Sequence, residues 1–249
     1  NSINARDGAN VVVGRTRADT ITGGVGNDTI TTGGGNDVVN AGDGTNTVTI
    51  SAGSSTAAVS VTTGAGKDVI HGEAGLGSET ISSGDGNDTI FTGVGNDVIR
   101  GGIGNDVITG GQGKDILTGG TGNDTFNFGV GGTTAAPVSE SSFTVAQGDQ
   151  ITDWEAGDKL HFSALAGTTA IGTAGSTTYV EVTATDYDSA TALANTFFSG
   201  GTVHYAVAQV GADVEVFADT HNGGVLDAGD GAVVLVGRAL TDIDASNIV

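Results

Sequence analysis

Apolar residues recur at every ninth position through the first half of the chain. Aligned in nines, the sequence reads GGVGNDTIT from Gly23, TGGGNDVVN from Thr32, and then, after an irregular patch, SGDGNDTIF from Ser83 through GGTGNDTFN from Gly119. Thirteen units, some weaker or stretched, cover residues 5–127. In each unit a large apolar residue stands in the middle of the last three positions, which predicts a three-residue strand whose middle side chain points inward. The expected inward residues are Ile21, Ile30, Val39, Val48, Val61, Ile70, Ile81, Ile90, Ile99, Ile108, Leu117 and Phe126.

The second half of the chain has a different pattern. Residues 143–249 alternate apolar and polar positions between turn residues, in FTVAQ, DKLHFSAL, TTYVEVTA, TVHYAVAQV, ADVEVFAD and GAVVLVG, which predicts strands. One helix is expected over Ser189–Phe197, where Ala and Leu fall at helical spacing. The sequence therefore predicts a repeat domain over residues 1–127, interrupted near 50–62 and 76–77, a linker over 128–142, and a small β-domain over 143–249.

Each unit has the form G-G-x-G-x-D-x-U-x, where U is a large apolar residue. Over residues 5–127 this half of the chain resembles the RTX family of type I-secreted bacterial proteins, whose nonapeptide repeats bind calcium in a parallel β-helix. The resemblance implies an all-β fold: a calcium-binding parallel β-roll followed by a small C-terminal β-domain.

The chemistry of the unit agrees with this expectation. Glycine-rich turns can adopt positive φ and bring carbonyl oxygens to a shared point. If two units make one turn of a coil, alternate units stack about 4.8 Å apart and their Asp side chains form two rows. Such rows repel unless a cation neutralises them, and calcium suits them better than magnesium because flexible carbonyls do not easily meet a strict octahedron.

The resemblance also implies which residues hold the ions. Each ion is expected to take the carbonyls of positions two and four and the Asp of one unit, together with the carbonyls of positions one and three and the Asp of the unit two later. This places one ion among Gly84, Gly86, Asp88, Gly101, Ile103 and Asp106; a second among Gly93, Gly95, Asp97, Gly110, Gln112 and Asp115; and a third among Gly102, Gly104, Asp106, Gly119, Thr121 and Asp124.

Further expected metal ligands lie earlier in the repeats. They are Asp19, Gly24, Gly26, Asp28, Gly34, Asp37, Gly64, Gly66, Asp68 and Glu79. Asn10, Asn46 and Val59 depart from the motif at the acid position, and a side chain at position three, such as Asp43, is expected to face water. About six or more Ca²⁺ ions are expected in total.

Three segments of the second half carry separate hints. Residues 149–160 (DQITDWEAGDKL) resemble the segment that follows the repeats in RTX exoproteins, and 242–249 mix acids and aliphatics as the uncleaved export signals of that family do. Asp219–Asp230 has the length of an EF-hand loop, with Gly224 at position six, but His221 and Gly223 stand where oxygen ligands are expected. This segment is either an ion-binding loop or an acidic hairpin turn.

Composition and net charge limit the classes of partner that the chain is expected to bind. The 249 residues include 45 Gly, no Cys and 29 acids against eight bases, for a net charge of −21. Such a charge disfavours nucleic acid and anionic membranes as partners and favours cations. There is no thiolate metal site, no apolar run long enough to cross a membrane, and no H-E-x-x-H or G-x-S-x-G motif, so the protease and lipase chemistries of RTX enzymes are not expected.

These observations predict a non-enzymatic, secreted structural protein with two possible contexts. The abundance of Thr, Ala, Gly, Ser and Val resembles that of RTX-type surface-layer subunits, which implies export by the type I secretion machinery and self-association into a lattice on the bacterial cell surface. The alternative is the secretion and folding module of a larger RTX exoenzyme, toxin or adhesin. The formation of ordered sheets on addition of calcium distinguishes the two.

Overall fold

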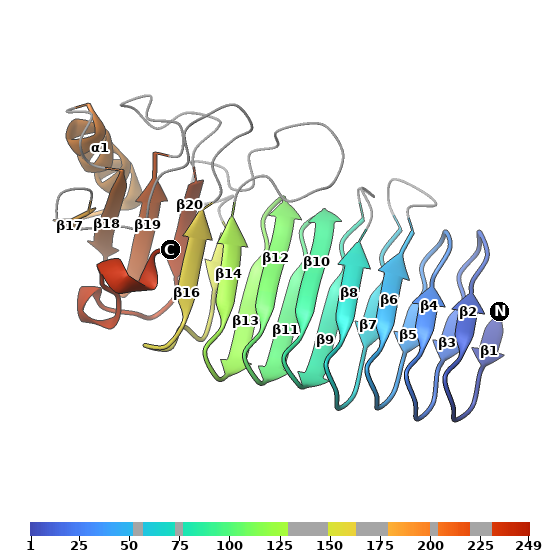
Figure 1. Cartoon of the computed structure of the whole chain (residues 1–249). Helices are drawn as coiled ribbons and strands as arrows, with labels where there is room; N and C mark the ends of the chain where they lie inside the picture. The colour runs from blue at the N-terminus through green and yellow to red at the C-terminus, as the bar shows by residue number, and fades with distance from the viewer. Residues whose placement is uncertain (52–56, 73–76, 129–148, 163–178, 200–203, 220–230) are drawn as a thin grey trace. The chain divides into compact units, whose positions relative to one another are not determined.

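The chain divides into two compact units, and most of its regular structure is β (Figure 1). The computed structural model describes residues 1–51, 57–72, 77–128, 149–162, 179–199, 204–219 and 231–249. The first unit comprises Asn1–Gly111 and Leu117–Asp124, and the second comprises Gln112–Ile116 and Thr125–Val249. The expected strand at 143–147 and all but one residue of the expected linker lie outside the described residues.

The repeats of the first unit form a parallel β-roll of two sheets (Figure 1). One sheet has the order β1-β3-β5-β7-β9-β11-β13, with bounds Ser2–Asn4, Thr20–Thr22, Val38–Asn40, Ser60–Thr62, Thr80–Asp85, Val98–Ile103 and Ile116–Thr121. The other contains β2, β4, β6, β8, β10 and β12, with bounds Val11–Val13, Thr29–Thr31, Thr47–Ile50, Val69–Gly72, Thr89–Val94 and Val107–Gln112. Two strands make one turn of a solenoid of about six turns, which confirms the predicted fold class.

Consecutive turns stack in register on the apolar positions. Ile21 pairs with Val39, and Ile81 pairs with Ile99, both 18 residues apart. Where the repeat is irregular, the same positions still pair: Val39 meets Val61 after 22 residues, and Val61 meets Ile81 after 20. The two interruptions therefore lengthen a turn without shifting the ladder.

The expected inward residues form the core of the roll. All of those in the first unit, from Ile21 to Leu117, are at most 1% exposed. Most are β-branched, which suits strands that stack directly on one another. Position eight of the repeat is thus confirmed as the core position.

The strand lengths differ from the expectation in part of the roll. Several early strands have the expected three residues, but β9 to β13 have six. The extra residues belong to the next turn, where Gly102 pairs with Gly84 and Ile103 with Asp85. Parallel pairing continues into the turn there because glycine accepts the positive φ of 126° at Gly102 that the bend requires.

The second unit combines a short parallel pair with a mixed sheet. β14 (Thr125–Phe128) pairs in parallel with β16 (Lys159–Phe162), and Phe126 lies opposite Leu160. The mixed sheet has the order β15-β20-β19-β18-β17, with bounds Asp149–Ile151, Gly231–Leu235, Asp213–Ala218, Tyr205–Val210 and Tyr179–Ala184. Two 3₁₀ turns, Leu240–Asp242 and Ala245–Asn247, lead to the C-terminus.

Helix α1 (Tyr187–Phe198) covers one face of this sheet. Its buried Ala190, Ala194 and Phe198 pack with Ala206 and Phe217 of β18 and β19. The helix expected over Ser189–Phe197 is confirmed, but it begins two residues earlier. The Asp186 side chain accepts a hydrogen bond from the Ser189 backbone N–H at 2.8 Å, so Asp186 is the N-cap. No helix in the described part of the chain is long and apolar enough to cross a membrane.

Candidate metal sites

The acids at position six form ladders along the edges of the roll. The Asp68 N–H donates to Asp88 Oδ1, the Asp88 N–H to Asp106 Oδ1, and the Asp106 N–H to Asp124 Oδ1, each at 2.8 Å. We call this row, which begins Asn10, Asp28 and Asn46, the even column because its members precede even-numbered strands. The ladder holds each carboxylate in the turn through one of its two oxygens.

The second carboxylate oxygens of the ladder are buried. Among the residues that the structure describes, Oδ2 of Asp28, Asp37, Asp68, Asp88 and Asp106 has no hydrogen-bond partner. These side chains are at most 2% exposed. A buried, unpartnered carboxylate oxygen is strongly unfavourable unless a cation approaches it. The roll thus carries a line of anionic oxygens that its own donors do not satisfy.

The pKa shifts of the buried Asp side chains also favour a bound cation. Burial raises the pKa of Asp106 to about 6; the hydrogen bond from the Asp88 N–H opposes this rise, and the charges of Asp88 and Asp124 add to it. Burial likewise raises the pKa of Asp37, Asp68 and Asp97. These four carboxylates are therefore costly to ionise in the folded chain without a counter-ion.

The opposite edge carries a second row, which we call the odd column: Asp19, Asp37, Val59, Glu79 and Asp97. The Asp19 N–H donates to Asp37 Oδ1 at 2.8 Å, and the Glu79 N–H donates to Asp97 Oδ1 at 2.7 Å. Glu79 therefore takes the acid position, as expected. Val59 is buried and offers no side-chain oxygen, so the row is interrupted at this residue.

The turn carbonyls and carboxylates fit a hard cation. Calcium accepts six or more oxygen ligands in flexible geometry, which a glycine-rich turn can offer. No group of three or more His, Cys, Asp or Glu side chains among the described residues is arranged to hold a metal. The ligand sets implied by the repeats do not require such a group, because they use two carboxylates per ion and take the remaining oxygens from the backbone. The expected sets Gly84–Asp88 with Gly101–Asp106, and Gly102–Asp106 with Gly119–Asp124, fall wholly in the first unit.

Asp115 lies in the second unit. Its N–H donates to Asp149 Oδ1 at 2.8 Å, and Asp149 is 1% exposed. Sequence reasoning did not single out Asp149 as a ladder residue, because 34 residues separate it from Asp115 where the repeat has 18. Its Asp-x-Ile pattern, like Asp-x-Ile in the repeats, was the available signal.

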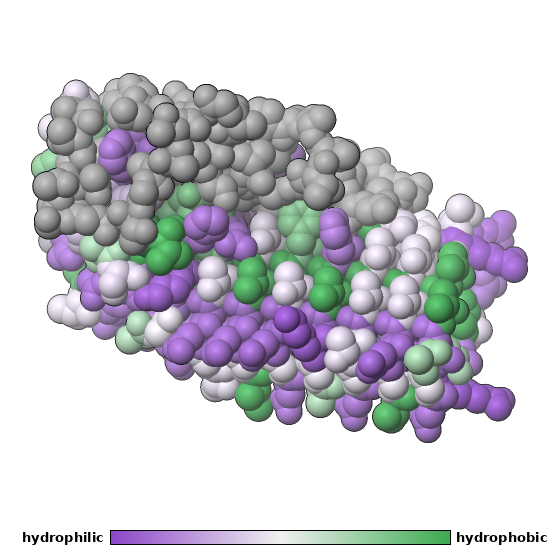
Figure 2. All heavy atoms as spheres, viewed as in Figure 1, coloured by the Kyte–Doolittle hydropathy of each residue, from purple (hydrophilic) through white to green (hydrophobic). Residues whose placement is uncertain are grey.

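Two further ladders of side-chain hydrogen bonds between turns were not predicted from the sequence. At position five, Asn27 Oδ1 accepts the Thr45 N–H, and Asn87 Oδ1 accepts the Asn105 N–H, each at 2.9 Å. At position three, Asp43 is exposed as expected, but its Oδ1 also accepts the Ala65 N–H at 3.0 Å. These bonds add a second link between turns, through an amide oxygen at position five and a carboxylate oxygen at position three. Hydrophilic residues dominate the face of the roll drawn in Figure 2, and hydrophobic residues occur there in small separate groups.

The possible EF-hand loop lies outside the described residues, apart from Asp219 at its start, which is buried.

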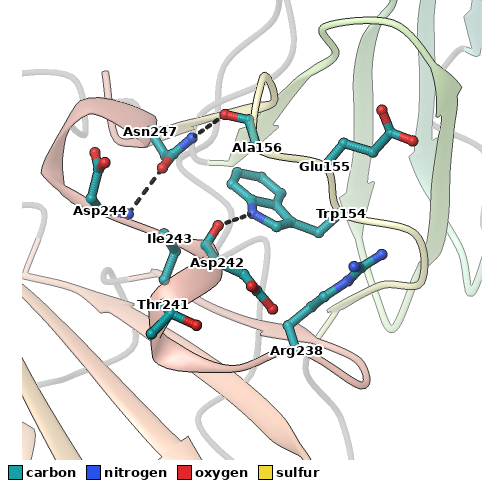
Figure 3. Close-up of a pocket in the computed structure, with 9 residues that line it drawn as sticks. All are labelled: Trp154, Glu155, Ala156, Arg238, Thr241, Asp242, Ile243, Asp244 and Asn247. Atoms are coloured by element: carbon teal, nitrogen blue, oxygen red, sulfur yellow. Dashed lines mark hydrogen bonds between the residues drawn. The ribbon is translucent and has the colours of Figure 1, made fainter.

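The described part of the second unit has a cavity of about 460 Å³ lined by residues such as Trp154, Arg238 and Asp242 (Figure 3). The Trp154 indole N–H donates to the Asp242 carbonyl at 3.0 Å, and Asn247 Nδ2 donates to the Asp158 carbonyl at 2.9 Å. The C-terminal residues are therefore an integral part of this unit.

Comparison with known proteins identifies the repeats. The fold and the paired acid rows define a calcium-binding parallel β-roll. A family model described as the RTX calcium-binding nonapeptide repeat (4 copies) matches residues 13–48, 58–76, 73–108, 91–126 and 100–134. The chain thus contains RTX calcium-binding repeats, and its repeat domain is a calcium-binding structural module.

Solved structures with some similarity include two subunits of the Azotobacter vinelandii mannuronan C5-epimerase. The AlgE6R3 subunit is 25% identical over 74% of this chain and 78% of its own, with a TM-score of 0.36. The AlgE6R2 subunit is 25% identical over 76% of this chain and 90% of its own, with a TM-score of 0.34. The extracellular lipase LipA from Serratia marcescens is 16% identical over 97% of this chain and 38% of its own, with a TM-score of 0.29. The comparison with curated proteins found no match.

Proposed function

We propose that this chain is part of a calcium-dependent, non-enzymatic structural protein of the bacterial cell surface, a surface-layer subunit that type I secretion exports. The observation that carries the calcium dependence is the line of buried carboxylate oxygens, such as those of Asp28, Asp88 and Asp106, that have no hydrogen-bond partner in the part of the chain that the structure describes. Calcium would supply the positive charge that these oxygens lack, and it would be held by the turn carbonyls and by an acid from each of two stacked turns. About six or more ions would bind in this way.

The proposal links folding to location. Extracellular calcium modules bind with dissociation constants of about 10⁻⁴–10⁻³ M, well above cytosolic calcium. Inside the cell the acid rows would repel and the glycine-rich chain would stay unfolded, which suits export. Outside, calcium would fold the roll. RTX repeats usually belong to secreted proteins, which supports this order of events.

The proposed lattice rests on composition. Gly, Thr, Ala, Ser and Val dominate, Cys and Met are absent, and acids outnumber bases 29 to eight. A lattice-forming subunit with this charge would use calcium to reduce repulsion between copies as well as within the roll.

The test is a calcium titration of dilute protein, followed by circular dichroism and electron microscopy. We expect the β-sheet signal of the roll to be lost in chelator and to return with calcium, and ordered sheets to form above the folding midpoint. A β-sheet signal that is insensitive to calcium removal would refute the calcium-dependent fold. Calcium-dependent folding into soluble monomers would favour a secretion and folding module of a larger protein instead of a lattice subunit.

A further inference from the structure

Two members of the even column are asparagines that keep the ladder. The Asp28 N–H donates to Asn46 Oδ1 at 2.9 Å, and the Asn46 N–H donates to Asp68 Oδ1 at 2.7 Å. The Asn10 N–H donates to Asp28 Oδ1 at 2.8 Å. Each Asn side chain therefore stands where the other turns place an Asp, and Asn46 is fully buried.

The side-chain nitrogens of these asparagines bind their own turns. Asn46 Nδ2 donates to the Gly42 carbonyl at 2.9 Å and the Gly44 carbonyl at 3.2 Å. Asn10 Nδ2 donates to the Arg6 carbonyl at 2.7 Å and the Gly8 carbonyl at 2.9 Å. In both turns the accepting carbonyls are at positions two and four of the repeat, the carbonyls that each turn is expected to offer to a cation.

The orientation of the amide follows from its neighbours. Asn46 Oδ1 faces a backbone N–H, and Nδ2 faces two carbonyl oxygens; exchanging the two atoms would set oxygen against oxygen and nitrogen against N–H. The Asn amide therefore donates to both turn carbonyls, of which Gly42 also accepts the Gly64 N–H at 3.0 Å, and it removes the negative charge that would attract a cation. In the Asp turns, by contrast, the second side-chain oxygen of Asp88 or Asp106 has no hydrogen-bond partner among the described residues.

We propose that the Asn10 and Asn46 turns stack without a cation, because the side-chain amide of each replaces the ion at its own carbonyls. The inference rests on the proposed calcium function and adds that the two positions at which Asn departs from the motif, between Asn10 and Asp28 and between Asn46 and Asp68, hold no ion. The Asn46 turn is also where the ladder spans 22 residues instead of 18. Because the amide bonds lie within one turn, they do not depend on how the lengthened next turn is placed.

The test is the number of calcium ions bound at saturation by Asn46→Asp, measured by native mass spectrometry and equilibrium dialysis. The substitution restores a carboxylate opposite Asp68 and removes the donors that block Gly42 and Gly44, so we expect one more ion per chain than in the wild type. The matched control is Asn27→Asp, which adds the same charge at an exposed position five and should leave the number unchanged. Asn10→Asp provides a second test at the other amide turn and should also add one ion.

The outcomes separate this inference from the proposed function. A wild type that binds no calcium refutes the proposed function. A wild type that binds calcium, together with folded Asn46→Asp and Asn10→Asp variants that bind the same number of ions, overturns the inference alone. If neither variant folds in calcium, solvent exchange of the Asn46 side-chain amide in the wild type tests the inference. In the calcium-saturated wild type, Asn46 Nδ2 protons that exchange slowly with solvent support the inference, because a cation at these carbonyls would leave the amide without acceptors, and rapid exchange overturns it.

Discussion

Asp106 is the residue at which the calcium model makes its sharpest prediction. It is 1% exposed, its Oδ1 accepts the Asp88 N–H, and its own N–H donates to Asp124 Oδ1. The proposed ligand sets assign it to two successive ions. Asp106→Asn preserves the shape of the side chain and the Oδ1 acceptor but removes the charge.

The substitution should have opposite effects with and without calcium. Without calcium, burial raises the pKa of Asp106 from 3.8 to about 6, so ionising it at neutral pH costs roughly 3 kcal/mol. Removing the charge should therefore stabilise the calcium-free roll by up to about 3 kcal/mol. With calcium, the loss of one member of a buried charge cluster typically costs about 3–5 kcal/mol. The free energy that calcium adds to folding should thus fall by at least about 3 kcal/mol, equivalent to about a hundredfold in free calcium for one ion.

The assay is a calcium titration of wild type and Asp106→Asn followed by circular dichroism, together with urea unfolding of both in saturating calcium. The control is Asp43→Asn, which removes the same charge from an exposed position and keeps an oxygen to accept the Ala65 N–H. It should change the stability in calcium by about 0.5 kcal/mol or less, as most surface substitutions do, and leave the calcium midpoint close to that of the wild type. Equal calcium midpoints for the two variants would refute the assignment of Asp106 as a ligand and the repeat register behind it.

Two further substitutions test other parts of the molecule. Gly101→Ala would place Cβ against Asp106 Oδ2 and the Gly119 carbonyl oxygen, so thermal scans in calcium should show a large loss of stability. The control is Gly237→Ala, whose Cβ would have no described atom within 4 Å and which should cost about 1 kcal/mol from its positive φ alone. Equal losses of stability in the two variants would contradict the close approach at Gly101. Burial raises the pKa of Glu215 to about 8, well above the ordinary 4.5, so the folded chain binds this proton more tightly than the unfolded chain does. The contribution of Glu215 to the stability of the second unit should therefore be fully present below about pH 4.5 and be lost as pH rises through about 8. Thermal unfolding from pH 6 to 9 should show a fall in wild-type stability that is absent in Glu215→Gln, and equal pH profiles for the two proteins would contradict the shift.

The repeat sequence by itself determined the roll. A large apolar residue recurs at every ninth position, and all of these residues can be buried together only if alternate units stack. The pattern therefore predicts the parallel register, the core from Ile21 to Leu117 and the rows of acids. The pairing of Val39 with Val61 across a lengthened turn followed from the same apolar positions, because a slip by one residue would turn each core side chain outward.

The tertiary structure alone decided how individual polar atoms are satisfied. Asn and Asp have the same shape and occupy the same position of the repeat. Only the folded turn shows that Asn46 donates to two carbonyls, whereas Asp106 Oδ2 has no hydrogen-bond partner among the residues with described positions. The pairing of Asp149 with Asp115 likewise joins residues whose spacing matches no repeat. Periodicity reports which side chains share a face, whereas hydrogen bonding depends on which atoms lie within about 3 Å of each other, and that is determined only when the chain has folded.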